Sequence, residues 1–223
     1  MKLSNDAISV LKNFSSINES IFVNKGNTLQ TISKQKNILA EAKVPDNFTD
    51  EFGIYDVNNF LGLMSLTSSE IDFEPKNLII KALDGRSVIR YRKAAKETIV
   101  VPPDKKVNMD KAEISLELTA SDLVWITKVA STLGSPNLVF SSDGTDVFVE
   151  AFDAKDDSAH VNTTKICAGN GKKYRMIFNK DNLRFIPGAY SISIKSSGVG
   201  HFKNKDFPVE YWITTEAGSK YEG

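Results

Sequence analysis

The segment LTASDLVWITKVAST (118–132) decides the fold, because LSNDAISVLKNFS (3–15) has the same pattern 115 residues earlier. Each segment begins with a leucine and a hydroxyl residue, and Ile8 in the first corresponds to Leu123 in the second. Serine and threonine are favoured N-caps, and apolar residues three or four positions apart form one stripe of an amphipathic helix. We therefore predict two equivalent helices, at 4–15 and 119–132.

A second pair of segments repeats in the same order. IYDVNNF (54–60) corresponds to IFNKDNL (177–183), which lies 123 residues later. Asp56 and Asn179 are residue types favoured at N-caps, so we predict shorter helices at 56–66 and 179–186. Two matches in the same order predict an internal duplication, with about eight more residues of loop in the second half.

Strand periodicity dominates the rest of the chain. Apolar and polar residues alternate in segments such as 38–44, 114–118 and 190–194, which indicates strands with one buried face. KETIVVPPDKK (96–106) contains adjacent prolines followed by charged residues, a composition typical of an extended connector. The sequence therefore predicts an α+β protein of two similar domains, 1–95 and 111–223, joined by a connector at 96–110.

The chain lacks the residue patterns of an enzyme site. Its two histidines, His160 and His201, and its one cysteine, Cys167, do not have the spacing of metal ligands. We therefore expect no enzymatic activity, no metal and no cofactor. The sequence also contains no apolar run long enough for a signal peptide or a membrane span, so we expect a soluble protein in a reducing compartment.

Charge is distributed unevenly although the net charge is zero, with 28 Lys and Arg against 28 Asp and Glu. The outward faces of the predicted helices carry small polar and basic residues, whereas acidic residues gather in loops and strands. Charges close to a phosphate act within the Debye length of about 8 Å, so distant acid is screened. Such faces can hold DNA while the protein stays neutral overall. The basic residues are Lys12, Lys128 and the i,i+4 pair Lys180 and Arg184.

Several short motifs occur in an order that matches a known family. They are MKLS (1–4), LKNF (11–14), IN (17–18), IYD (54–56), FLG (60–62), Leu66, Asp84–Ser87, DSA (157–159) and PGAY (187–190). Their collinearity resembles the DNA polymerase sliding clamps of T-even-type bacteriophages over essentially the whole chain. The connector and residues 67–77 diverge more from that pattern.

The resemblance implies a processivity factor that forms a homotrimeric ring of six similar domains. In this DNA clamp fold each domain has antiparallel sheets outside and two helices on the inner face. The implied partners are double-stranded DNA bound without sequence preference, an ATP-dependent clamp loader, and a DNA polymerase tethered through its C-terminal peptide. The resemblance also implies a role in late transcription, with a sigma factor or coactivator as partner, in the cytoplasm of the infected bacterial host and away from any membrane.

The resemblance and the charge pattern together assign roles to individual residues. By resemblance, 86–91 and 159–166 are the sheet edges that meet between subunits, and we predict that Ile89 and Tyr91 pack near Val161 and Thr163 of the neighbour. The residues expected to face DNA are Lys2, Lys12, Lys128, Lys180 and Arg184, through phosphate contacts that carry no direct sequence information.

The connector offers a candidate site for partner peptides. Ile99, Val100 and Val101 are consecutive apolar residues on an otherwise polar segment, so we predict that they border a peptide pocket; a buried connector strand is the alternative. The alternative function for the whole chain is a viral structural or assembly protein that forms a ring or tube without encircling DNA.

Overall fold

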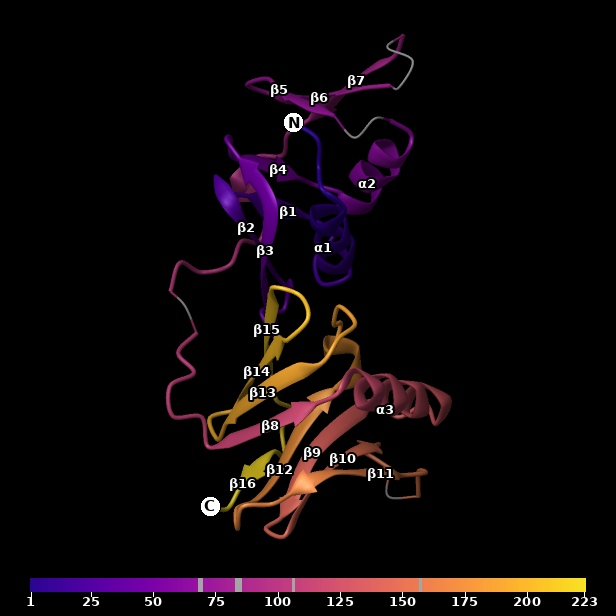
Figure 1. Cartoon of the computed structure of the whole chain (residues 1–223), viewed down its shortest axis with the longest axis vertical. Helices are drawn as coiled ribbons and strands as arrows, with labels where there is room; N and C mark the ends of the chain where they lie inside the picture. Colours follow the sequence, from indigo (N-terminus) through magenta and orange to yellow (C-terminus); the bar gives the residue numbers. More distant parts are fainter. Residues whose placement is uncertain (68–69, 83–85, 106, 157) are drawn as a thin grey trace. The chain divides into compact units, whose positions relative to one another are not determined.

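The computed structural model describes residues 1–67, 70–82, 86–105, 107–156 and 158–223, which form two compact units, 1–106 and 107–223 (Figure 1). The division between the units falls within the predicted connector, whose bounds stay a prediction. The motif residues Asp84, Gly85 and Asp157 lie outside the described residues.

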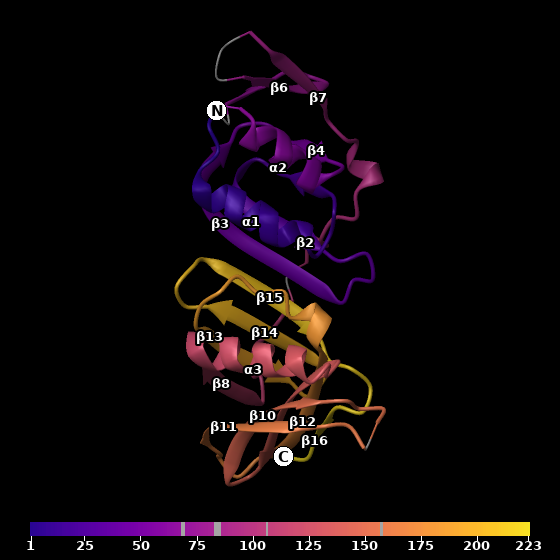
Figure 2. The same cartoon turned by 90° about the vertical axis from the view of Figure 1, so that its right-hand side faces the viewer.

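Among its described residues, unit 1 has two α-helices and three antiparallel groups of strands, and Figure 2 shows both helices lying beside the strands. The strand pairs are β1 with β4, β2 with β3, and β6 with both β5 and β7. The core is formed by the buried stripes of both helices and the inward face of β3. The elements are α1 (Asn5–Ser15), β1 (Ile21–Val23), β2 (Gly26–Ile32), β3 (Ile38–Phe48), β4 (Phe52–Ile54), α2 (Val57–Ser65), β5 (Ile71–Phe73), β6 (Asn77–Lys81), β7 (Val88–Arg92) and the 3₁₀ turn η1 (Lys96–Thr98).

Unit 2 has one α-helix among its described residues and two antiparallel groups of strands. The first group has the order β11-β10-β9-β12-β16, and the second has the order β15-β14-β13-β8. The elements are β8 (Ile114–Leu118), α3 (Ala120–Thr132), β9 (Asn137–Asp143), β10 (Asp146–Phe152), β11 (Asn162–Ala168), β12 (Lys173–Asn179), the 3₁₀ turn η2 (Lys180–Asn182), β13 (Tyr190–Lys195), β14 (Val199–Asn204), β15 (Val209–Thr214) and β16 (Lys220–Tyr221).

The three α-helices begin where the sequence predicts. Ser4 caps α1 and accepts a hydrogen bond from the amide of Ala7, and Asp56 caps α2 by accepting from the amide of Asn59. Thr119 forms a capping box with Asp122 at the start of α3. Each cap satisfies amide groups that have no partner within the first helical turn.

The helix predicted at 179–186 is wrong, because the chain forms only the short 3₁₀ turn η2 there. The phenyl ring of Phe185 packs within 5.1 Å, between centroids, of the rings of Tyr190, Phe202 and Tyr211. The backbone of Ile186 donates to the hydroxyl of Tyr211 and accepts from the hydroxyl of Tyr190. These contacts replace helical hydrogen bonds, and proline at 187 disfavours helical geometry at the residue before it.

Candidate functional site

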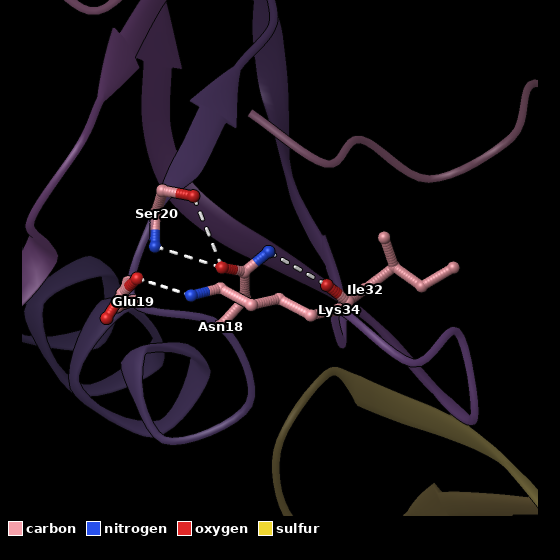
Figure 3. Close-up of polar contacts among 5 residues, drawn as sticks. All are labelled: Asn18, Glu19, Ser20, Ile32 and Lys34. Carbon is pink, nitrogen blue, oxygen red and sulfur yellow. Dashed lines mark hydrogen bonds and ion pairs between the residues drawn. The ribbon is translucent and has the colours of Figure 1, made fainter. Parts of the chain in front are cut away.

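A polar loop fixes the two helices of unit 1 (Figure 3). The buried side chain of Asn18 donates to the carbonyl of Ile32 at 2.9 Å and accepts from the amide and hydroxyl of Ser20. The carbonyl of Glu19 accepts from the amide of Val57, the first residue of α2. The end of α1 is thereby tied to β2 and to the start of α2, so that both helices are held in a defined position.

The outward face of these helices is polar and weakly charged. Asn5, Ser9 and Lys12 are exposed on α1, and the hydroxyl of Ser15 donates to the side-chain oxygen of Asn58 on α2 at 2.8 Å. Lys12 forms no ion pair within the described parts of the chain. This face therefore offers one unpaired cation among small hydrogen-bonding groups.

The outward face of α3 carries Lys128 and two large apolar side chains. Lys128 is exposed, as are Val124 (61%) and Trp125 (55%). The helix packs its opposite stripe on β10 and β11. Helical spacing predicted Lys128 on this face, and the same spacing puts Trp125 beside it, although no role was predicted for Trp125.

The remaining predicted DNA-facing residues are not on helices. Lys2 is exposed and forms an isolated bridge with Glu70. Lys180 lies in η2, and Arg184 follows it in irregular chain, where its Nε donates to the carbonyl of Asp181. The predicted i,i+4 basic pair on a helix face is therefore wrong, because the helix that would align Lys180 and Arg184 is absent.

Both strands predicted to meet between subunits lie at sheet edges. In unit 1, β7 is the outer strand beside β6, and in unit 2, β11 is the outer strand beside β10. An edge strand has backbone donors and acceptors without partners along one side, which makes it a template for pairing with another chain. The two edges predicted from the resemblance are thus available in each unit.

Ile89 and Tyr91 face the interior of unit 1. The ring of Tyr91 packs on Phe60 of α2 with 5.4 Å between centroids, and its hydroxyl donates to the carbonyl of Asp56 at 3.2 Å. Partial burial raises the pKa of the Tyr91 hydroxyl. Ile89 pairs with the fully buried Ile80 across the sheet. Both side chains therefore point toward the helix side of their sheet.

Val161 and Thr163 point to the side away from the helix of unit 2. Thr163 lies opposite Glu150, whose neighbours Val149 and Ala151 are fully buried on the α3 side. Ile89 and Tyr91 thus share the helix side, whereas Val161 and Thr163 share the opposite side. If the two edges form one continuous sheet, these pairs lie on different faces, so the predicted side-chain contact does not follow from edge pairing.

A shallow groove lies on the outer face of the β11-β10-β9-β12 sheet. Its volume is about 510 Å³, and Phe148, Phe152 and Val161 form part of its wall. The guanidinium of Arg175 lies 4.7 Å from the ring centroid of Phe152 and 4.0 Å from the carboxylate of Glu150. This outer face of the sheet therefore combines apolar surface with charged groups.

The connector residues divide into one buried and two partly exposed side chains. Ile99 is buried, and its Cδ1 lies 2.8 Å from the position that a Cβ on Gly53 would occupy. Val100 and Val101 are 37% and 36% exposed. Burial of the connector, the alternative to a peptide pocket, therefore applies to Ile99. Val100 and Val101 remain candidates for contact with a peptide.

The described residues provide neither a metal site nor a membrane-spanning helix. The described part of the chain contains no group of three or more His, Cys, Asp or Glu side chains placed to hold a metal ion. Within the same ranges, none of the helices combines the length and the hydropathy needed to traverse a bilayer.

Comparison with known proteins gives a consistent set of relatives. The family described as DNA polymerase processivity factor matches residues 4–101. The chain is 29% identical to the sliding clamp of Vibrio phage KVP40, over 97% of this chain and 100% of the relative. It is 27% identical to the sliding clamp of Escherichia phage RB69 and 28% identical to that of Enterobacteria phage T4, in both cases over 100% of each chain.

Solved structures show the same architecture at lower identity. A PCNA from A. fulgidus, solved with the C-terminal region of FEN-1 bound to it, aligns with a TM-score of 0.67 and 16% identity over 96% of both chains. PCNA from Thermococcus kodakaraensis aligns with a TM-score of 0.66 and 13% identity, over 94% of this chain and 95% of that one.

Proposed function

We propose that this chain, a phage sliding clamp homologous over its full length to those of KVP40, RB69 and T4, works as a homotrimeric ring around duplex DNA. The homology identifies the chain as a processivity factor for DNA polymerase and not an enzyme. The trimer, the encirclement and the individual contacts are what we propose, from the edges, faces and charges of each unit.

The observation that carries the proposal is the pair of open edges, β7 in unit 1 and β11 in unit 2. Pairing β7 of one subunit with β11 of the next joins two different patches, which is a heterologous contact. Repeating such a contact closes a ring when the rotation between neighbours is one third of a turn. Closure also covers β7 and β11 in every subunit, which protects these two edges from other pairing.

We call the line along which β7 of one subunit pairs with β11 of the next the seam. The faces of the two strands determine which side chains meet there. Joined edges continue one sheet, so Val88 on the exposed side of β7 comes next to Val161, which lies directly before β11. Val88 and Val161 are 47% and 52% exposed in the subunit. Burial of these two exposed valines against each other is the physical basis for the contact. This arrangement replaces the contact predicted for Ile89 and Tyr91.

The helices then supply the wall that faces DNA. Lys12 on α1 and Lys128 on α3 reach phosphates, with Lys2 nearby in sequence to α1, and Lys180 and Arg184 contribute from outside any helix. Contacts to phosphate hold a duplex without reading its sequence. Because topological enclosure keeps the protein on DNA, weak attraction is enough, and strong base contacts would stop sliding. A net charge of zero is compatible with this mode of binding.

The partners follow from the same function. The clamp tethers DNA polymerase through a C-terminal peptide at the surface around Ile99, Val100 and Val101, and an ATP-dependent loader opens the ring. The FEN-1 segment bound to A. fulgidus PCNA supports peptide binding as a mode of recognition for this fold. A late-transcription sigma factor or coactivator is a further proposed partner. We place these events in the cytoplasm of the infected bacterial host.

Retention on circular DNA tests encirclement. The protein is loaded with its loader and ATP on nicked circular DNA, separated from free protein, and the circle is then cut once with a restriction enzyme. A ring stays on the intact circle and is lost from the cut molecule through its free ends. Equal retention before and after cutting would contradict encirclement, because a surface binder does not depend on DNA topology.

The mass in solution tests the oligomer separately. Light scattering should give three times the 24.7 kDa of one chain. A mass of one chain at all concentrations would contradict the trimer, whatever the DNA experiment shows.

A further inference from the structure

The exposed indole of Trp125 is the feature of α3 that phosphate binding does not explain. The buried side of the helix is formed by Leu123, Ile126 and Ala130. Trp125 lies on the other side and is 55% exposed. Aromatic side chains bury large areas when they find a partner, so an indole left half exposed near the middle of a helix marks a surface that binds something.

The surroundings of Trp125 suit a polyanion. Lys128 lies one turn further along the same side, is exposed, and forms no ion pair with the part of the chain that the structure describes. Ser121, one turn before, is exposed and neutral. Asp122 is the one acidic residue in the sequence of α3, and its carboxylate accepts hydrogen bonds from the amide and hydroxyl of Thr119. Its charge is therefore held at the helix start.

We propose that Trp125 and Lys128 form a contact site for unpaired DNA bases. The indole stacks on a base that has no pairing partner, and the ammonium group of Lys128 binds an adjacent phosphate. Aromatic stacking combined with a cation is the general mode of binding single strands, because every base has a π face. Bases inside a duplex are already stacked on both faces, so Trp125 favours single-stranded DNA over duplex.

This inference rests on the proposed function, which directs α3 toward DNA. It adds a preference that encirclement does not require. A clamp with this site holds the unpaired template strand beside a primer end more tightly than it holds the duplex through which it slides. Sliding along duplex remains weakly hindered, because the indole has no free base face to bind there.

Fluorescence provides the first test, because the chain has two tryptophans. The variant Trp212→Phe leaves Trp125 as the only indole; Trp212 is half-buried and stacked on His201, so the substitution removes an unrelated signal. Titration of this variant with a short oligothymidylate should quench its emission, and a hairpin duplex at the same low salt should quench it less. Emission unchanged when fluorescence anisotropy shows the oligonucleotide to be bound would overturn the site.

Affinity ratios provide the second test. Trp125→Ala should reduce the affinity for labelled oligothymidylate at least about fivefold, the lower end of what one stacked base contributes, and should reduce duplex affinity less. Lys128→Ala is the matched control: it removes a phosphate contact and should weaken both ligands to a similar degree. An unchanged ratio in Trp125→Ala, or dissociation of the trimer by that substitution, would overturn the inference. If the unchanged protein is not retained on intact circles while Trp125→Ala still lowers the single-strand to duplex affinity ratio, encirclement is contradicted and the Trp125 site stands.

Discussion

Replacing Val161 by aspartate should dissociate the proposed ring without unfolding the subunit. Val161 lies directly before the edge strand β11 and is 52% exposed. A substitution on such a surface usually changes the free energy of unfolding by no more than about 0.5 kcal/mol. In the ring the same position is covered by β7 of the neighbour, so the new carboxylate would be removed from water.

The size of the effect follows from this change in exposure. Full burial of a valine side chain contributes about 1.5 kcal/mol or more, so covering the exposed half contributes about 1 kcal/mol. A carboxylate that loses hydration without a partner costs a further 1–3 kcal/mol, roughly. Each seam is then weaker by about 2–4 kcal/mol, and a ring with three seams by roughly 6–12 kcal/mol.

Sedimentation velocity over a range of concentrations measures the outcome, with thermal unfolding recorded in parallel. Val161→Asp should sediment as a monomer under conditions where the unchanged chain is a trimer. At concentrations where both proteins are monomeric, their melting temperatures should be nearly the same. Val124→Asp is the matched control, because Val124 is 61% exposed on α3 and lies on neither edge strand. A trimeric Val161→Asp protein, or equal dissociation by both substitutions, would refute pairing through β11.

Three further predictions concern the subunit itself. Thr119→Ala removes the capping box with Asp122 and should lower the free energy of unfolding by about 1 kcal/mol in urea titrations; an unchanged midpoint would contradict the role of the cap. Gly53→Ala places a Cβ 2.5 Å from the carbonyl oxygen of Ala94, and the forced shift should cost about 1–3 kcal/mol, visible as a lower melting temperature. Burial raises the pKa of Tyr174 from 10.0 to about 12, so the folded state keeps a proton that the unfolded state releases, and stability should fall above pH 10. Tyr174→Phe should make that alkaline loss smaller, and an identical pH profile would exclude the assignment.

Local signals predicted the helices that have a cap and a long apolar stripe. Ser4, Asp56 and Thr119 each precede a helix that begins at the next residue. The likeness to the PCNA structures confirms the expected clamp fold, and the homology to phage clamps confirms the resemblance. The helices and strands were predictable from one sequence because N-caps and period-two alternation act over only a few residues.

Tertiary contacts decided the segment that sequence reasoning assigned incorrectly. Asn179 is a suitable cap, and it does accept a hydrogen bond from the amide of Asp181. The helix still ends after one turn because Phe185 and Ile186 contact tyrosines that lie on β13 and β15. Contacts between residues far apart in sequence are not visible in the local pattern.

The candidate site was predicted in part for a similar reason. Sequence alternation placed Ile89 and Tyr91 on one side of their strand, which the burial pattern of β7 matches. It does not tell which side faces the helices, and Phe60 determines that by packing on Tyr91. Helical spacing predicts that Trp125 lies opposite the apolar stripe. Its exposure indicates a binding surface only together with the exposed Lys128 and with Asp122, whose carboxylate is held in the capping box.

Unequal helix content in the two units has a consequence for rotation within the proposed ring. Unit 1 has α1 and α2, whereas the described part of unit 2 has α3 alone. In a ring of three chains, sectors with two helices would alternate with sectors with one. The electrostatic potential around an enclosed duplex would then repeat three times per circuit instead of six.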